Sequence, residues 1–353
     1  MNKIILFLFF PFAVNGQFSI VEILSKFRNP GEVNLIKENY SELTYMMLFD
    51  EEEVADTTIT FDEIETKYKL YNKKNTTYKE NKLIEENASN DGNTTSTNIY
   101  TFNNNGFVVA HDLKLDGEMS MMNESKQYTY DDKNRITKVR LLKENMKVDN
   151  VVFEAAYEDG LLPSYAKMNI MLDMEIKKEV TKNGFRYNFL TKIPQDLIDM
   201  AKKEMGGNPT EAEILKELGS FGKIQKKYSD VTTIANGDLK EDIYEEDKEK
   251  AGKMDLIATL IFDKNYNILS KKIFSKDADP ITEIYEYTKE GKVLSMQIGS
   301  EEKKINEFDA AGNLIKEHKA YGYILRKYEG GKLVKEMDCS DNGSATSFSV
   351  YKY

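Results

Sequence analysis

The chain has 353 residues, a formal net charge of -11, 40% hydrophobic residues and 31% charged residues. Globular domains average roughly 45–50% apolar and 25% charged residues, so this balance favours a structure with much exposed surface, such as a long sheet. Acidic and basic residues are interspersed without a basic stripe. Because binding to nucleic acid and to anionic lipid depends on clustered Lys and Arg, the sequence disfavours both kinds of partner.

The N-terminal segment, residues 1–16, has the pattern of a secretory signal peptide. Lys3 supplies a positive charge, Ile4–Ala13 are almost wholly apolar, and small or permissive residues precede a predicted cleavage site before Gln17. An apolar run of about 11 residues is too short to span a bilayer, which takes ~20, and no later run is long enough. The sequence therefore predicts a secreted or periplasmic protein with no transmembrane segment in its mature part.

Residues 17–55 follow, and they have helical patterning. The apolar residues at helical spacing are Ile20, Ile23, Leu24 and Phe27. Pro30 and Gly31 break this run, and Leu35–Leu48 are compatible with a second helix. We expect an N-terminal helical cap, because a stack of repeats needs its first strand edge covered. A helix that binds a partner is the alternative.

The rest of the chain repeats one pattern, which is clearest in residues 223–353. An apolar or aromatic strand ends in an aromatic residue, a polar turn containing Gly or Asn follows, and a second apolar strand returns. The four clear copies are Leu260–Leu269, Ile284–Leu294, Ile305–Ile315 and Ile324–Val334. Their aromatic residues Phe262, Tyr287, Phe308 and Tyr328 lie 25, 21 and 20 residues apart. A nearly fixed period of this length indicates a repeated β-hairpin.

Residues 56–193 hold looser copies of the hairpin. They are Tyr100–Val109, Tyr128–Val139, Ala156–Leu162 and Val180–Tyr187, with strand-like residues further upstream at Tyr68, Leu70 and Tyr71. Residues 85–97 and 238–252 are polar or densely charged, which predicts loops. The predicted fold class is mainly β: an extended antiparallel sheet of repeated hairpins, in units of about 20–28 residues.

These units resemble the YD (Rhs-type) repeats of exported bacterial proteins, and two of them are the nearest matches. The match is the succession of aromatic, acidic, glycine or asparagine, and apolar residues in Tyr128–Ile136 and Asn306–Leu314. The resemblance covers about half of the chain and implies a long twisted sheet, which in the largest family members wraps around a toxin domain. We expect no toxin domain after the repeats here, so the resemblance implies an architecture and no activity. Tyr328–Gly331 suggests a weaker analogy to glycine-rich MORN-like repeats.

Residues 194–222 interrupt the repeats with a predicted helical hairpin. Pro194 opens the first helix, which Gly206 and Gly207 end, and Pro209 starts a second helix that closes at Gly219. This insertion could brace one face of the sheet or cover a binding groove.

No residue of the chain is predicted to be catalytic, to bind a cofactor or to bind a metal. His111 and Asp112 are adjacent, so in a strand they point to opposite faces and cannot act as a catalytic base and its orienting partner. His318 lies among Lys and Glu and is expected at the solvated surface, and Cys339 is expected to be an inert, half-buried thiol. Asn103–Gly106 and Ser340–Gly343 lack the carboxylates of a calcium loop, which favours hairpin turns.

These observations predict an exported, non-enzymatic β-repeat protein that acts as a scaffold or binding surface for an unknown protein, peptide or glycan. The alternative is an exported hydrolase with a carboxylate site in a groove between the sheet and the helical hairpin. An enzyme should have a deep pocket with converging Asp, Glu or His side chains, whereas a scaffold should have shallow faces and rows of aromatic residues.

Overall fold

The computed structural model describes residues 19, 21, 38–46, 69–89, 94–143, 148–158, 162–169, 173–193, 195–206, 209–210, 213–214, 226–247, 250–276 and 278–353. Within these ranges there are 23 strands. They pair antiparallel, both within each hairpin and between neighbouring hairpins. The predicted mainly β fold of repeated antiparallel hairpins is confirmed. The predicted signal peptide, residues 1–16, lies outside the described residues.

The chain divides into two compact units. Unit 1 contains Met1–Phe27 and Ala155–Thr282, and unit 2 contains Arg28–Glu154 and Glu283–Tyr353. These boundaries differ from the sequence divisions at residues 194 and 223, since they follow contacts between strands rather than the position of the helical insertion.

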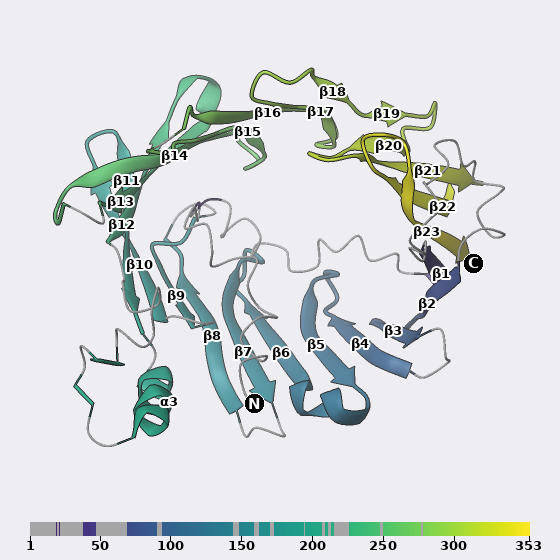
Figure 1. Ribbon diagram of the computed structural model, residues 1–353, viewed down its shortest axis with the longest axis horizontal. Helices are drawn as coiled ribbons and strands as arrows, with labels where there is room; N and C mark the ends of the chain where they lie inside the picture. The colour runs from purple at the N-terminus through teal and green to yellow at the C-terminus, as the bar shows by residue number, and fades with distance from the viewer. Residues whose placement is uncertain are drawn as a thin grey trace. The chain divides into compact units, whose positions relative to one another are not determined.

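Unit 2 is built from strands of both ends of the chain. Its N-terminal strands are β1 (Tyr40–Met46), β2 (Lys69–Lys79), β3 (Lys82–Ser89), β4 (Thr94–Phe102), β5 (Val108–Leu115), β6 (Glu124–Tyr130), β7 (Ile136–Lys143) and β8 (Val148–Ala156), with the 3₁₀ turn η2 (Gly117–Met122) between β5 and β6. Its C-terminal strands are β16 (Ile281–Tyr287), β17 (Val293–Ile298), β18 (Lys304–Ile305), β19 (Glu307–Phe308), β20 (Leu314–His318), β21 (Tyr323–Glu329), β22 (Lys332–Cys339) and β23 (Ala345–Lys352). Figure 1 shows β2 to β8 as successive hairpins in blue to teal.

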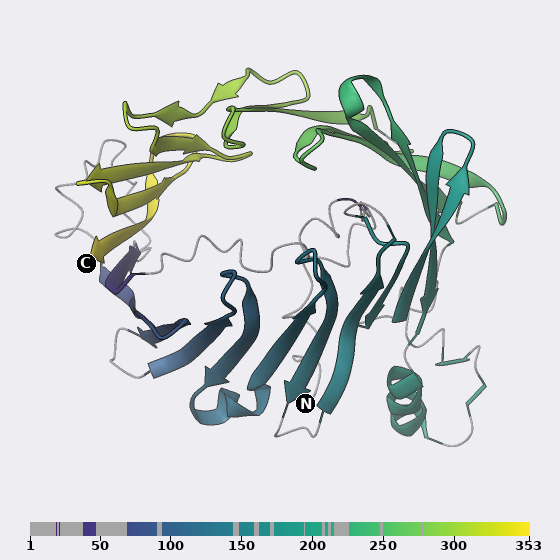
Figure 2. The same cartoon turned by 180° about the vertical axis from the view of Figure 1, so that it is seen from behind.

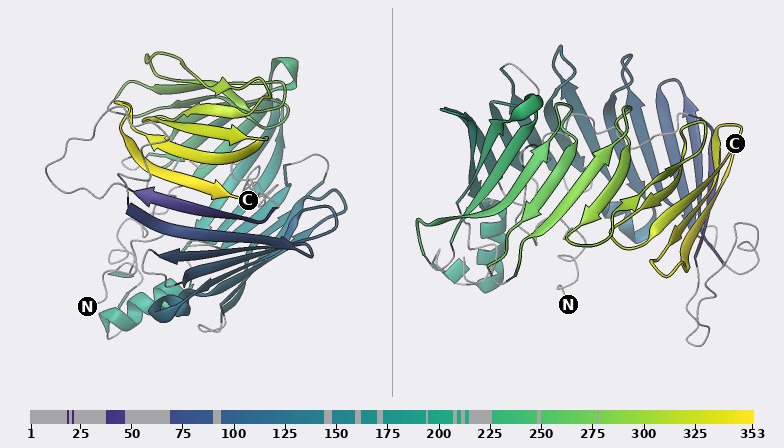
Figure 3. Two further views of the ribbon diagram at one scale, coloured as in Figure 1. Left: turned by 90° about the vertical axis from the view of Figure 1, so that its right-hand side faces the viewer. Right: turned by 90° about the horizontal axis from the view of Figure 1, so that it is seen from above.

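Strand β1 overturns part of the predicted helical cap. The sequence predicts a helix over Leu35–Leu48, but Tyr40–Met46 are a strand. This strand lies between β2 and the C-terminal strand β23 and pairs antiparallel with both, as the left view of Figure 3 shows. Hydrogen bonds to two neighbours, together with its aromatic and β-branched residues, favour the extended conformation over the helix. Of the remaining cap, only residues 19, 21, 38 and 39 are described.

Two predicted loops are also strands over most of their length. Of residues 85–97, the described part belongs to β3 and β4, and of residues 238–252, Leu239–Glu246 form β13. In both segments the polar residues alternate across the strand and meet partners on neighbouring strands. Asn87 donates to Ser96 at 3.1 Å, and Lys227 pairs with Glu245 at 2.9 Å. Cross-strand pairs of this kind stabilise polar strands that composition alone assigns to loops.

Unit 1 has seven further strands, which are drawn in teal to green in Figure 2. They are β9 (Tyr165–Asn169), β10 (Asp173–Thr181), β11 (Gly184–Lys192), β12 (Lys227–Thr233), β13 (Leu239–Glu246), β14 (Met254–Phe262) and β15 (Ile268–Ile273), with the 3₁₀ turn η5 (Ala235–Gly237) before β13. Each pairs with the next. One face holds the core of the unit, and Tyr187 lies fully buried there, with its hydroxyl donating to the carbonyl of Pro163 at 3.1 Å.

The predicted helical insertion is confirmed in its first helix. This helix, α3 (Gln195–Met205), ends at Gly206, which has a positive φ of 68° and donates its N–H to the carbonyl of Lys202. At the expected start of the second helix, Thr210 and Glu213 form a capping box, in which each side chain accepts the other residue's N–H. Most of that second helix lies outside the described residues.

Seven turns in the described part of the chain share one five-residue form. In each copy the first residue donates its N–H to the carbonyl of the fifth and accepts the N–H of the fourth. The copies are 103–107, 131–135, 234–238, 263–267, 288–292, 309–313 and 340–344. The fourth residue has a positive φ in every copy, which explains why Gly or Asn recurs there. In five copies an oxygen of the first side chain also accepts an N–H of the turn.

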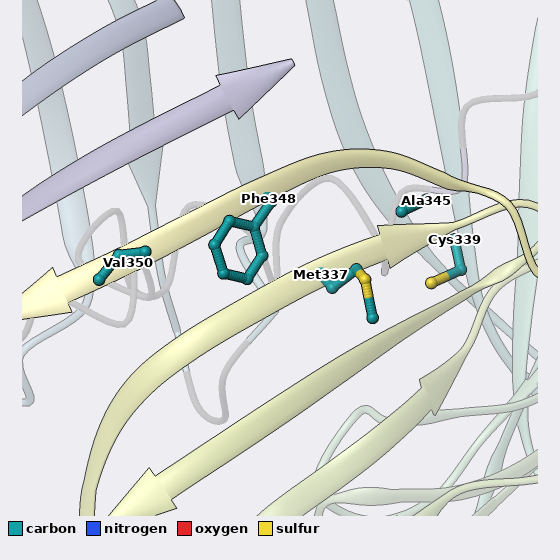
Figure 4. Close-up of a cluster of buried hydrophobic side chains, with 5 residues drawn as sticks. All are labelled: Met337, Cys339, Ala345, Phe348 and Val350. Atoms are coloured by element: carbon teal, nitrogen blue, oxygen red, sulfur yellow. The ribbon is translucent and has the colours of Figure 1, made fainter. Parts of the chain in front are cut away.

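Unit 2 buries an apolar cluster on one face of its C-terminal strands. Figure 4 shows Met337 and Cys339 on β22 beside Ala345, Phe348 and Val350 on β23. Leu43 and Tyr45 of β1 pack against this cluster, so the N-terminal strand completes a core that the C-terminal hairpins begin. Because side chains alternate along a strand, the residues between these point to the opposite face.

Candidate functional site

The opposite face carries a row of polar side chains, which on the N-terminal strands borders the buried apolar cluster of Leu83, Phe102 and Val108. We call it the ladder face. In strand order from β20 through β23 and on from β1 to β7, it carries Glu317, Arg326, Glu336, Ser349, Glu42, Lys74, Glu85, Asn98, Tyr100, His111, Lys126, Glu124 and Lys143. Residues that lie directly opposite each other on adjacent strands point to the same face, and so do residues two positions apart on one strand. Each residue of the row is related to the next in one of these two ways or by both together.

The row begins at Arg326, which joins three strands. Its guanidinium donates to Glu317 on β20 at 2.6 Å and to Glu336 on β22 at 2.7 Å. Burial opposes the charge on Arg326, but the two carboxylates outweigh it and raise the pKa of the guanidinium. The guanidinium therefore stays charged, and both carboxylates are held in place by it.

Lys74 is the centre of the row and lies between two carboxylates. Its ammonium contacts Glu42 at 2.5 Å and Glu85 at 4.0 Å, and these three side chains are only 24%, 15% and 13% exposed. Burial raises the pKa of Glu85, Lys74 opposes this, and Glu42 adds to it. Ser349 of β23 donates to Glu42 at 3.1 Å, which extends the network across the junction of the two chain ends.

The row continues through His111. Its ring stacks on Tyr100 at 4.4 Å between centroids with an interplanar angle of 1°, and its Nε2 hydrogen bonds to Asn98 Oδ1 at 3.0 Å. Burial, and then Lys126, lower the pKa of His111, so the ring is neutral at pH 7. Beyond it, Glu124 contacts Lys126 at 2.6 Å and Lys143 at 3.4 Å.

Tyrosines run beside the charged groups on this face. The ring of Tyr40 lies 6.0 Å from Tyr351 and 5.8 Å from Tyr353, and Lys74 lies over Tyr40 at 5.7 Å. Burial, and then Glu85, raise the pKa of Tyr100 to about 12, and burial likewise raises that of Tyr128 to about 12. These phenols keep their protons at any physiological pH and can donate as well as accept hydrogen bonds.

The charged groups of the row form ion pairs with one another. Paired carboxylates still have free lone pairs, and ammonium groups have three N–H donors, so the row can exchange hydrogen bonds with a polar ligand. Of the tyrosines beside it, Tyr40 is only 9% exposed, and Tyr100 and Tyr128 are partly exposed and pack against a buried apolar cluster.

Two surface hollows lie among the described residues. One, of about 190 Å³, lies in unit 1 at the ends of β9, β10 and β11 and includes Lys167, Asp173 and Glu175. The other, of about 410 Å³, lies in unit 2 and is lined by Glu301–Ile305 and His318. In the second, Lys304 is already bound to the carbonyls of Lys319 and Ala320.

The residues singled out from the sequence have the following places. Asn103–Gly106 and Ser340–Gly343 are hairpin turns, as predicted. The ring of His318 is partly buried rather than fully solvated, and burial together with Lys316 lowers its pKa. Cys339 is buried more deeply than predicted, at 2% exposure, and burial raises the pKa of its thiol. The sequence does not predict the ladder face, because its members are scattered from Glu42 near one end of the chain to Ser349 near the other.

Within the described part of the chain, no group of three or more His, Cys, Asp or Glu side chains is placed to hold a metal ion. Over the same residues, no helix has both the length and the apolar character needed to cross a membrane.

Comparison with known proteins identifies no family. No family model and no curated protein matches the chain. Among solved structures, it is similar to the TcdB2-TccC3-Cdc42 and TcdB2-TccC3-TEV crystal structures, at 9% and 11% identity and TM-scores of 0.24 and 0.22. In both cases the match covers 80% of this chain but only 18% of the other.

The chain is also similar to a porin-like protein from Bacteroides uniformis, at 8% identity and a TM-score of 0.28, over 89% of this chain and 95% of that one. At TM-scores this low, the three likenesses carry no argument about the function of this chain.

Proposed function

We propose that this protein is an exported, non-enzymatic binding protein whose ladder face takes an uncharged, hydroxyl-rich chain, the chemistry of a neutral polysaccharide. The observation that carries the proposal is the row of alternating, mutually paired charges from Glu317 to Lys143 with tyrosines beside it. The row crosses strand after strand, so it suits a ligand that is itself long and repetitive.

The charge pattern supports an uncharged ligand. A polyanion would have to displace Glu42 or Glu85 from Lys74, and a polycation would have to displace Lys74 from them. Leaving one member of a partly buried ion pair without its partner is costly. A ligand with hydroxyl groups uses the remaining donors and acceptors and leaves the ion pairs intact.

The aromatic residues support the same ligand class. Tyr100, Tyr128 and Tyr351 are partly exposed, and their side chains combine an apolar ring with a hydroxyl group. The chain has 21 Tyr and no Trp, so tyrosine is the residue that serves this purpose here.

We also propose that the hairpins are degenerate YD (Rhs-type) repeats. The five-residue turn supports this, since it explains why the motif has an aspartate at the first position of the turn and a glycine at the fourth. Asp309 accepts two N–H groups of its turn, at 2.9 and 2.8 Å, and Gly312 supplies the positive φ. The motif then determines the fold, and the residues on the strands determine which ligand binds.

Affinity electrophoresis of the full chain through gels containing soluble neutral glucans, mannans, galactans or xylans, with alginate and polylysine as charged controls, tests the proposal. We expect at least one neutral polymer to retard the protein equally at low and high salt. Retardation by alginate or polylysine alone, lost at high salt, would contradict it, because that pattern is the one expected for charge attraction.

Export remains part of the proposal and has its own test. When the chain is expressed in its native host, mass spectrometry of the protein outside the cytoplasm should find a mature N-terminus at Gln17. A cytoplasmic protein that retains Lys3 would contradict export without bearing on the ladder face.

A further inference from the structure

A buried carboxylate in unit 1 holds the N-terminal segment of the chain. Glu241 of β13 is completely buried, and its Oε2 accepts a hydrogen bond from the Ser19 hydroxyl and one from the Val21 N–H at 3.4 Å. The other oxygen, Oε1, accepts the hydroxyl of Ser229 on β12. Ser19 and Val21 are themselves 1% and 0% exposed, so both residues belong to the core of unit 1.

The surroundings of Glu241 are apolar. Its direct cross-strand partners are Val231 on β12 and Leu260 on β14, and both are buried. A carboxylate in such a place is costly unless hydrogen bonds compensate it. The Ser19 hydroxyl and the Val21 N–H come from a segment far away in sequence, and the third donor comes from the neighbouring strand. Two of these three donors therefore come from Ser19 and Val21.

We propose that the core face of unit 1 contains a binding site for a Ser-x-Val segment, which the chain's own residues Ser19–Val21 fill as an intramolecular ligand. Glu241 and Ser229 form the permanent half of the site, and the segment supplies a hydroxyl donor, a backbone donor and an apolar side chain. The inference is independent of what the ladder face of unit 2 binds.

Hydrogen exchange of the full chain, measured by mass spectrometry on peptides covering residues 17–27, tests the docking. The Ser19→Ala and Glu241→Gln variants should exchange this segment about tenfold faster or more than the wild type, as expected for the loss of hydrogen bonds to a charged group. Asp242→Asn is the matched control. Asp242 follows Glu241 on β13 and accepts the hydroxyl of Thr259 at 2.6 Å, but its side chain points to the opposite face from that of Glu241.

Exchange in peptides from β10 and β11 separates loss of docking from loss of fold, because those strands stay protected if unit 1 remains folded. Equal exchange of residues 17–27 in wild type, Ser19→Ala and Glu241→Gln would overturn the proposal. So would an effect of Asp242→Asn as large as that of Glu241→Gln.

A second variant tests the site in trans. Ser19→Asp places a second carboxylate beside Glu241 and should expel the segment of the full chain through like-charge repulsion. A fluorescent peptide of residues 17–27 should then bind this variant, and the same peptide with Ala at position 19 should bind at least about tenfold more weakly. Equal binding of the two peptides, or binding that Glu241→Gln leaves unchanged, would contradict the proposed recognition.

Discussion

Asp263 clasps the fifth residue of its turn, Asn267, with both carboxylate oxygens. Oδ1 accepts the backbone N–H of Asn267 at 2.9 Å, and Oδ2 accepts the side-chain amide of the same residue at 2.8 Å. Asp309 and Asn313 repeat the arrangement at 2.8 and 2.9 Å. The acidic residue that follows the aromatic one in the repeat is therefore part of the turn, and it is not a candidate for catalysis.

Replacing Asp263 by Ala should lower the free energy of unfolding by about 1–2 kcal/mol, because two N–H groups and one amide lose their acceptor. Asp263→Asn keeps one oxygen acceptor and should lose less than half as much. Lys264→Ala, at an exposed position of the same turn, is the control and should change stability by less than about 0.5 kcal/mol. Urea denaturation measures all three, and equal losses for Ala and Asn would refute the clasp.

Gly322 is required for steric reasons. Its φ is +88°, and a Cβ at this position would lie 2.0 Å from the carbonyl oxygen of Cys339. Gly312 has a similar φ of +80° with open space around it. Gly312→Ala should cost about 1–2 kcal/mol for the left-handed conformation alone, whereas Gly322→Ala should cost about 3 kcal/mol or more. If denaturation gives the two variants the same stability, the close approach to Cys339 is wrong.

Lys74 should be a sensitive cation of the ladder face. Lys74→Met leaves Glu42 and Glu85 without their shared partner, and because the group is partly exposed we expect a loss of about 2 kcal/mol rather than the 3–5 of a fully buried pair. The double variant Lys74→Met with Glu42→Gln should recover part of the loss. Lys138→Met removes a more exposed pair with Glu154 and should cost less than about 0.5 kcal/mol. A loss as small for Lys74→Met would argue against the network.

The two histidines should both titrate below their ordinary pKa of about 6.5. Burial, and then Lys126, lower the pKa of His111, and burial and Lys316 lower that of His318. Since the folded state binds protons more weakly than the unfolded state, the stabilisation is complete above about pH 6.5 and is lost as the pH falls toward the folded pKa.

Proton NMR resolves the two rings, since His111→Gln and His318→Gln each remove one signal. The wild type should lose stability between pH 7 and 5, and His111→Gln should lose less of it over the same range. A pKa at or above about 6.5 for His111 would show that its ring is not buried as described.

Local chemistry made the hairpins predictable. An aromatic residue, an Asp or Asn, and a Gly three positions later specify a turn within five residues, so the copies at Phe102 and Phe308 are recognisable directly from the sequence. Strand β1 could not be recognised in this way. Its residue Ser41 pairs with Lys352 from the opposite end of the chain, and neither neighbouring strand is joined to it by a short turn.

The candidate sites could not be predicted from the sequence for a related reason. Glu42, Lys74 and Glu85 each look like ordinary surface residues, and only the register between strands places them in one row. Glu241 likewise lies in a charge-dense stretch that composition assigns to a loop, although alternation places it on the core face of β13. The sequence therefore indicates which residues can form strands. Which side chains lie next to one another depends on the register between strands that are distant in sequence.

The central claim is that the ladder face binds a neutral glycan, and a glycan array tests it most directly with three full-length proteins. The wild type should bind at least one neutral glycan, and Tyr100→Leu combined with Tyr351→Leu should weaken that binding at least about tenfold, as expected when aromatic stacking and hydroxyl contacts are lost. Tyr321→Leu, at a residue 87% exposed and outside the ladder face, should bind like the wild type. Wild-type binding to no neutral glycan, or equal binding by all three proteins, would contradict the account.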